Sequence, residues 1–256
     1  MNRSRDKAAA YLGFLREYWR WLKTRGYVSE NPWLDQELPA PRRPSRNDEP
    51  DEGKRPYTDN ELRTLLNGPA QSHLPDLMRV AALSGMRIEE ICQLLVSDCE
   101  GGEFRVWHGK TANAKRTIPI HHDLQTIIGR RLANKSPSDF LFHELPDVPA
   151  SRDSRSDPAS KMFGRYRRKM AIEERPNGKA KSNVDFHSFR RWFIKKARDR
   201  LDQGNAGYSP WTIADVVGHD DEGIQKILRL TMAHYPGPSS TEAKRALIDG
   251  IKLPSP

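Results

Sequence analysis

The sequence predicts an α+β fold that is mainly α and carries one small antiparallel β-sheet. Apolar residues recur at three- and four-residue spacing in many segments, which is the pattern of amphipathic helices. Strand-like alternation occurs in a single pair of segments, residues 104–106 and 117–120, on either side of the polar turn His108–Lys115. This pair predicts a hairpin, and the hairpin would supply the sheet.

The helices are expected in a clear order along the chain. The first covers residues 5–25, where Leu12, Leu15 and Trp19 share one face and Gly26 follows as a stop. The second begins with a capping box, in which Thr58 caps the helix and Glu61 reaches back. Further helices are expected at about 75–83, from about 87, at 123–132, 160–170, 188–201 and 210–217, and from a capping box at Ser239–Glu242 to about 251. Residues 143–160 and 177–183 are expected to be loops.

The segment 39–56 separates two parts of the chain. It holds five prolines among charged residues and hardly an apolar side chain, which is typical of an extended linker. The helix before it cannot bury its own apolar face alone, so it must be the end of a larger domain or pack on the rest of the chain. Three parts are therefore expected: residues 1–38, a linker at 39–56, and one main domain at 57–256.

The composition favours a polyanionic partner. The 256 residues carry a formal net charge of +9 and a pI near 9.6, and nucleic acid is the usual partner of such a chain, with a merely basic soluble protein as the alternative. No apolar run approaches the roughly 18 residues of a membrane span, and the N-terminus lacks a signal-peptide core. Two cysteines, Cys92 and Cys99, make neither a disulfide framework nor a zinc site, so buried thiols and a reducing cytoplasm are expected.

Three segments hold the candidate chemistry. They are Ala82–Ile91, which contains Ser84-Gly85-Met86-Arg87; Phe186–Trp192, which contains His187-Ser188-Phe189-Arg190; and Val217-Gly218-His219, followed later by Tyr235. Their order resembles the catalytic domain of the tyrosine recombinase (phage integrase) family, over about residues 57–256. The family also places a lysine in a hairpin between the first two segments, where this chain has Gly109-Lys110-Thr111 and then Lys115–Pro119. One such segment alone is weak evidence, but all of them in order are strong evidence.

The resemblance implies a catalytic set of Arg87, Lys110, His187, Arg190, His219 and Tyr235, with Tyr235 as the covalent nucleophile. A DNA phosphodiester is an anion that gains charge as it is attacked, and fixed cations stabilise that state. Arginine suits the task because its planar fork binds two oxygens and keeps its proton. Arg87 and Arg190 would form the clamp, and His187, three residues before Arg190 on a helix, would share its face.

The remaining roles follow from the same resemblance. His187 would accept the tyrosine proton, His219 would donate a hydrogen bond to a phosphoryl oxygen, and Lys110 would protonate the departing 5′-oxygen. Glu90 would orient the site. No cofactor or metal is expected, because the phosphotyrosine link retains the energy of the broken bond and no acidic cluster suggests a Mg²⁺ site.

The expected partner is double-stranded DNA, with assembly as a homotetramer on it and accessory DNA-bending or directionality factors. Arg116, Arg165, Arg168 and Arg191 are candidate phosphate contacts, although a solvated helix face explains such residues nearly as well. The tail after Tyr235 resembles those of phage- and island-type integrases, which favours integration or excision of a mobile element. A bacterial or phage-derived, cytoplasmic, nucleoid-associated protein is expected, and no membrane.

Two departures from the family pattern stand out. Sixteen positions separate His219 from Tyr235, several more than usual, so action of Tyr235 within its own subunit or in a neighbour both stay open. Residues 1–38 resemble only the last helix of a core-binding domain. The alternatives are a catalytically silent DNA-binding protein of the same fold and a type IB topoisomerase-like relaxing enzyme.

Overall fold

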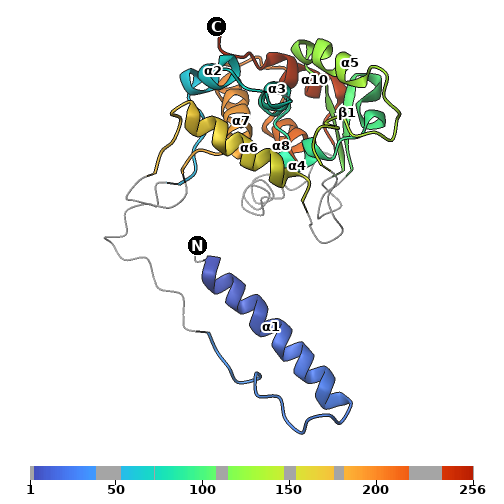
Figure 1. Cartoon of the computed structure of the whole chain (residues 1–256), viewed down its shortest axis with the longest axis vertical. Coiled ribbons are helices and arrows are strands. Elements are labelled where there is room, and N and C mark those ends of the chain that lie inside the picture. The colour runs from blue at the N-terminus through green and yellow to red at the C-terminus, as the bar shows by residue number, and fades with distance from the viewer. Residues whose placement is uncertain are drawn as a thin grey trace. The chain divides into compact units, whose positions relative to one another are not determined.

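The structure is a computed structural model that describes residues 3–38, 53–71, 73–107, 115–146, 154–175, 182–218 and 238–255. Its contacts divide the chain into two compact units, Met1–Asp51 and Glu52–Pro256 (Figure 1). Among the described residues, none of the helices is both long and apolar enough to span a membrane.

Among residues 3–38, the described part of the first unit, the structure contains one helix, α1 (Arg3–Thr24). The following segment folds back on it, because Arg16 donates from Nε to the carbonyl of Trp33 and from Nη2 to that of Gln36, at 3.0 and 2.7 Å. Aromatic side chains nevertheless stay exposed on α1, among them Tyr11 and Phe14.

The core of the second unit is built around the packing of α3 (Leu74–Ser84) on α7 (His187–Asp202). Helix α2 (Asp59–Asn67) begins with the expected capping box, in which the backbone of Thr58 donates to Glu61 at 2.8 Å. This start is tied to α7, because Trp192 Nε1 donates to Asp59 at 2.8 Å. Helix α3, which leads into the first sequence motif, and helix α7, which carries the second, therefore pack together in one core.

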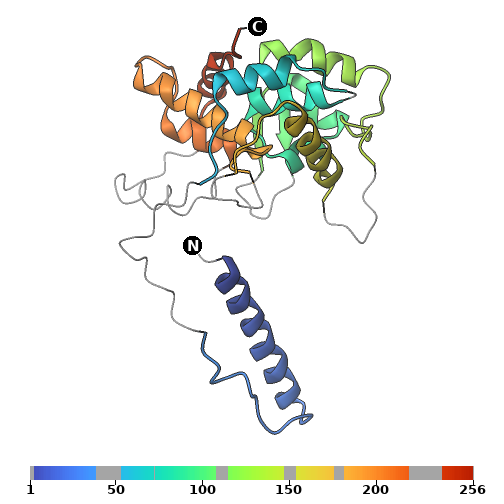
Figure 2. The same ribbon diagram turned by 60° about the vertical axis from the view of Figure 1, so that its left-hand side comes forward.

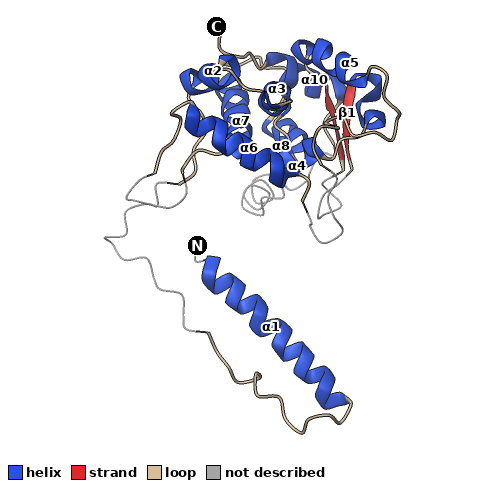
Figure 3. Cartoon of the chain, in the orientation of Figure 1, coloured by secondary structure: helices blue, strands red, loops and turns tan. Residues whose placement is uncertain are grey.

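The predicted hairpin is present and its register is defined. Strand β1 (Glu103–Val106) pairs antiparallel with β2 (Arg116–Pro119), and Phe104 lies opposite Ile118, both fully buried. The two strands are the sheet, and helices make up the rest of the regular structure in the described part of the chain (Figure 3). The mainly α, α+β fold class predicted from the sequence is confirmed.

The elements between the motifs complete the unit. They are α4 (Ile88–Cys92), the 3₁₀ segments η1 (Val96–Gly102) and η3 (His122–Leu124), α5 (Gln125–Leu132), α6 (Ser156–Lys169), α8 (Pro210–Val217) and α10 (Thr241–Gly250). Figure 2 shows α7 and α8 in orange on one side of the unit and α5 in yellow-green on the other. Helices α8 and α10 both pack on β2. Cys92 and Cys99 are free and buried, as expected, and burial raises the pKa of each thiol to about 12.

Two sequence expectations about helix starts are wrong. Residues 156–159 belong to α6 and not to a loop. The carboxylate of Glu89 accepts hydrogen bonds from Ser154 Oγ and from the backbone of Arg155 and Ser156, at 2.7 to 3.0 Å, and so anchors the helix from another segment. Helix α10 is capped by Ser240 rather than Ser239, so its third residue is an alanine and no reciprocal capping box forms.

Candidate active site

The first motif is a tight turn between α3 and α4. Gly85 ends α3 in the left-handed region with φ of 65°, and Arg87 follows in extended conformation as the residue before α4. The carboxylate of Glu90 accepts the backbone N–H of Arg87 at 2.8 Å and also its Nη1 at 3.0 Å. The side chain of Arg87 remains 40% exposed, so its guanidinium is both held and open to solvent.

The second motif brings Arg190 to the same turn. Its Nη1 donates to the carbonyl of Gly85 at 2.8 Å, and the residue is 2% exposed. Its buried Nη2 has no hydrogen-bond partner among the described residues. Burial, and then the positive charge of Arg87, lower the pKa of Arg190 to about 9, which still leaves the guanidinium protonated at neutral pH. A buried cation with a free donor is costly, and an anion would satisfy it.

His187 lies at the first turn of α7 beside these cations. Desolvation, and then the charges of Arg191 and Arg190, lower the pKa of its ring to about 4. The carboxylate of Asp185 opposes this shift. The ring is therefore neutral near pH 7, with a nitrogen that carries no proton in the free protein.

We expect a ring-nitrogen NMR titration of the free protein to show His187 neutral well below its ordinary pKa of 6.5. Because the folded pKa is the lower one, only the unfolded chain binds the proton as the pH falls from 6.5 towards 4. The contribution of His187 to stability is thus complete above this window and is lost within it.

An Asp185→Asn variant should lower the pKa of His187 further, because it removes the attractive charge. A His187→Gln variant assigns the resonance by its disappearance. A ring that titrates at or above 6.5 in the free protein would contradict this assignment of its charge state.

Arg116, a predicted DNA contact, has a nearly buried side chain and is not placed to reach a phosphate. Its side chain is 5% exposed, its Nη1 and Nη2 donate to the two carboxylate oxygens of Glu90 at 3.1 and 2.8 Å, and its Nε donates to the carbonyl of Val216 at 2.8 Å. The guanidinium is turned into the protein, so little of it is offered to a phosphate.

The other predicted DNA contacts remain predictions. Arg165 and Arg168 are exposed on α6, whereas Arg167 on the same helix is buried and donates to the carbonyl of Ile172. Arg191 is half-buried and donates to Asp185 at 3.3 Å. Nothing in the sequence singled out Asp185, although its position two residues before His187 is a usable signal.

Lys110, His219 and Tyr235 lie outside the described residues. Their predicted roles therefore rest on the sequence. Gly218, directly before His219, is described: it ends α8 with φ of 62°, and its carbonyl accepts Arg87 Nη2 at 3.0 Å. The structure thus brings together Arg87, Glu90, Arg190, His187 and the chain position that leads to His219.

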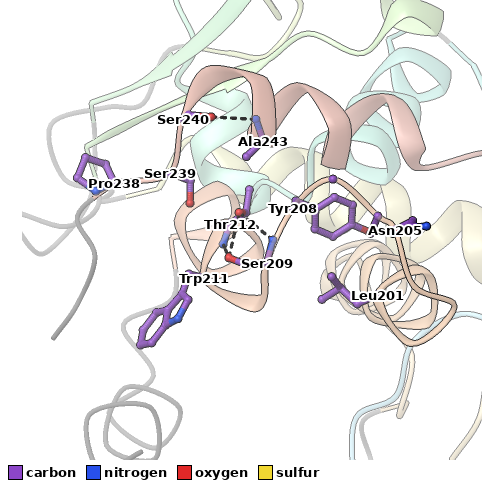
Figure 4. Close-up of a pocket in the computed structure, with 12 residues that line it drawn as sticks. Leu201, Asn205, Tyr208, Ser209, Trp211, Thr212, Pro238, Ser239, Ser240 and Ala243 are labelled. Atoms are coloured by element: carbon purple, nitrogen blue, oxygen red, sulfur yellow. Dashed lines mark hydrogen bonds between the residues drawn. The ribbon is translucent and has the colours of Figure 1, made fainter. Parts of the chain in front are cut away.

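Two other features are separate from this site. A cavity of about 700 Å³ lies where the end of α7 meets the starts of α8 and α10, and its lining includes Tyr208, Trp211 and Ser239 but none of the candidate catalytic residues (Figure 4). His121, His122 and Asp249 cluster within 4.8 Å, but both ring nitrogens of His121 already bond to backbone, at Ile251 and Asp123. His121 caps η3 by accepting the backbone N–H of Asp123 at its Nδ1.

The chain belongs to the phage integrase family, whose model matches residues 57–227. The match includes both arginines, His187, Lys110 and His219, and it ends before Tyr235. No curated protein matches the chain in a sequence search.

Solved integrases share the fold. The integrase from mycobacterium phage Brujita is 20% identical, with 99% of this chain and 74% of that chain covered and a TM-score of 0.53. A lambda integrase fragment, a dimer bound to a COC′ core site, is 18% identical, with 86% and 76% covered and a TM-score of 0.53. A Tn1549 transposon integrase fragment in complex with a circular intermediate DNA is 17% identical, with 94% and 78% covered and a TM-score of 0.51.

Proposed function

We propose that this chain is a site-specific DNA recombinase that cleaves and rejoins strands through a 3′-phosphotyrosyl intermediate. The observation that carries the proposal is the buried guanidinium of Arg190, whose Nη2 has no partner among the described residues and which lies close enough to Arg87 for the two charges to interact. The nearby carboxylate of Glu90 pairs with both Arg87 and Arg116, so one negative charge faces the three positive charges of Arg87, Arg116 and Arg190. The site therefore has an excess of positive charge and a free donor, which suit a phosphodiester.

The proposed reaction needs no other reactant. Tyr235 Oη attacks the scissile phosphorus, and His187 takes the tyrosyl proton. The bond from phosphorus to the 5′-oxygen breaks, and Lys110 protonates that oxygen, while Arg87, Arg190 and His219 stabilise the phosphoryl oxygens. A 5′-hydroxyl from another strand then reverses these steps and releases the tyrosine. The neutral ring of His187 is consistent with its part as proton acceptor.

The solved structures support the wider proposal. The lambda and Tn1549 integrases are described as bound to DNA, and lambda integrase also as a tetramer bound to a Holliday junction. We propose double-stranded DNA as the partner, a homotetramer as the working assembly, and integration or excision of a mobile element as the role. Accessory factors and a nucleoid location belong to the same proposal. We assign catalysis to residues 57–256, with 39–56 as a linker and 1–38 as a separate helical segment.

Covalent capture tests this function. Purified full chain is incubated with EDTA and a pool of nicked suicide duplexes tiled across the DNA on either side of its own gene. We expect a protein–DNA adduct that survives denaturation and that peptide mapping assigns to Tyr235. The matched control is Tyr235→Phe, which should bind DNA as the wild type does and form no adduct.

The other outcomes are also informative. DNA binding without an adduct in either protein would overturn the proposed reaction in favour of the silent DNA-binding alternative. An adduct that persists in Tyr235→Phe would leave the reaction class standing and remove Tyr235 as the nucleophile. Relaxation of an arbitrary supercoiled plasmid without site choice would favour the topoisomerase-like alternative.

A further inference from the structure

We infer that Arg116 is a positioning residue that joins three of the chain segments expected to carry catalytic groups. The inference rests on the proposed function. Arg116 is the first residue of β2, and Lys110 precedes it in the chain segment between β1 and β2. Its sequence context suggested a phosphate contact, whereas its contacts in the structure run inward.

Three hydrogen bonds tie Arg116 to one carboxylate and one backbone carbonyl. Two nitrogens of the Arg116 fork meet the two oxygens of Glu90, at 3.1 and 2.8 Å, and the third donates to the carbonyl of Val216 at 2.8 Å. Both side chains are nearly buried, at 5% and 6% exposed. A two-point contact of this kind fixes direction as well as distance, which a lysine cannot do.

Because Arg116 fixes the carboxylate of Glu90, it also fixes the position of Arg87, which bonds to the same carboxylate. Its Oε1 accepts Nη1 of both Arg87 and Arg116, and its Oε2 accepts the backbone N–H of Arg87. Without Arg116, the buried carboxylate would keep Arg87 as its main cation and would attract that guanidinium more strongly. Arg87 would then be drawn away from a phosphate. Arg116 thus shares the charge of Glu90 and leaves Arg87 available.

The third segment is the end of α8. Gly218 has φ of 62°, and a Cβ added there would lie 2.7 Å from Arg116 Nη1, so the guanidinium packs directly on the glycine backbone. The carbonyl of the same glycine accepts Arg87 Nη2 at 3.0 Å. His219 is the next residue. Arg116 therefore lies on the strand that follows the chain segment of Lys110, and its guanidinium contacts Glu90 beside Arg87 and the backbone of Gly218, the residue before His219.

The test compares Arg116→Met and Arg116→Lys with wild type in the capture assay. A matched control is Arg105→Met, because Arg105 is exposed on the paired strand of the same hairpin. Three quantities are measured on the full chain: DNA affinity with its salt dependence, the single-turnover cleavage rate of bound DNA, and the melting temperature. We expect affinity and salt slope close to wild type in both variants, and a cleavage rate about 10²-fold lower, the usual cost of a misplacement near 1 Å.

The Arg116→Lys variant distinguishes the effect of charge on the cleavage rate from the effect of geometry, because it keeps the positive charge and lacks the planar guanidinium. Guanidinium ion added to Arg116→Ala should restore part of the cleavage rate. Gly218→Ala should also slow cleavage, because its Cβ displaces the guanidinium of Arg116.

If Arg116→Met does not fold, the double variant Glu90→Gln with Arg116→Met removes the unpaired buried charge. The Arg116→Lys variant then still tests whether the geometry of the guanidinium is needed.

Specific results would overturn the inference. A loss of affinity across all DNA sequences, with a salt slope reduced by about one, would make Arg116 a phosphate contact. A normal cleavage rate per bound, folded molecule would make it merely structural. The absence of any adduct with wild type is a different failure, because it overturns the proposed function itself.

Discussion

An Arg190→Met variant will cleave bound DNA about 10³-fold more slowly than wild type, which is the scale for loss of a preorganised donor to a charged transition state. Arg190 is held by the carbonyl of Gly85 through one nitrogen and leaves its buried Nη2 without a partner among the described residues. Burial, and then the charge of Arg87, lowers the pKa of Arg190, and an anion bound by both guanidinium groups would relieve the repulsion between them. Because phosphate charge grows during attack, the loss should fall on the reaction more than on binding.

The measurement is single-turnover adduct formation at saturating DNA, with affinity measured separately. Arg198→Met is the control, since Arg198 is an exposed arginine on the same helix α7. We expect Arg198→Met to cleave at the wild-type rate and Arg190→Met to bind DNA within about tenfold of wild type. Equal cleavage rates in the two variants would show that the buried guanidinium does not act on the phosphate.

Local pattern was enough to predict most of the elements. The hairpin followed from alternation in 104–106 and 117–120, and the start of α2 followed from Thr58 and Glu61, because both signals act over a few residues. The presence of Arg87, His187 and Arg190 at one site was predicted through the resemblance, and their contacts agree with it. The three-residue spacing of His187 and Arg190 also predicted that the two side chains lie on one face of the helix.

Contacts between distant segments could not be predicted in the same way. The start of α6 depends on Glu89, which lies 65 to 67 positions away from the groups that it accepts. The inward direction of Arg116 depends on Glu90 and Val216, 26 and 100 positions away. A basic residue beside a hairpin turn gives the same pattern in sequence whether it meets DNA or a buried carboxylate. Burial decides between the two, and burial is a tertiary property.

Two glycines show how backbone conformation supports the site. Gly85 and Gly218 each end a helix in the left-handed region, and each packs closely on a side chain, Phe193 and Arg116 respectively. Each also offers its carbonyl to an arginine of the candidate clamp. Glycine is needed at both positions for conformation and for space, so the helix-stop signal seen in the sequence also carries a functional constraint.

Gly85→Ala should lower the free energy of unfolding by about 3 kcal/mol, from left-handed strain together with overpacking. An added Cβ would lie 2.6 Å from Phe193 in the core, on the helix that carries Arg190. The displacement should also slow cleavage, because the carbonyl of Gly85 holds Arg190 Nη1 at 2.8 Å. Urea unfolding and single-turnover cleavage measure the two effects on one variant.

Gly101→Ala isolates the strain, because Gly101 has φ of 71° and nothing lies within 4 Å of an added Cβ there. We expect this control to lose about 1 kcal/mol, the cost of a left-handed alanine, and to cleave at the wild-type rate. The difference between the two variants then measures the contact with Phe193. Equal losses of unfolding free energy in Gly85→Ala and Gly101→Ala would mean that Phe193 moves aside at no cost. The close packing of α7 on the Gly85 turn would then play no part in holding Arg190.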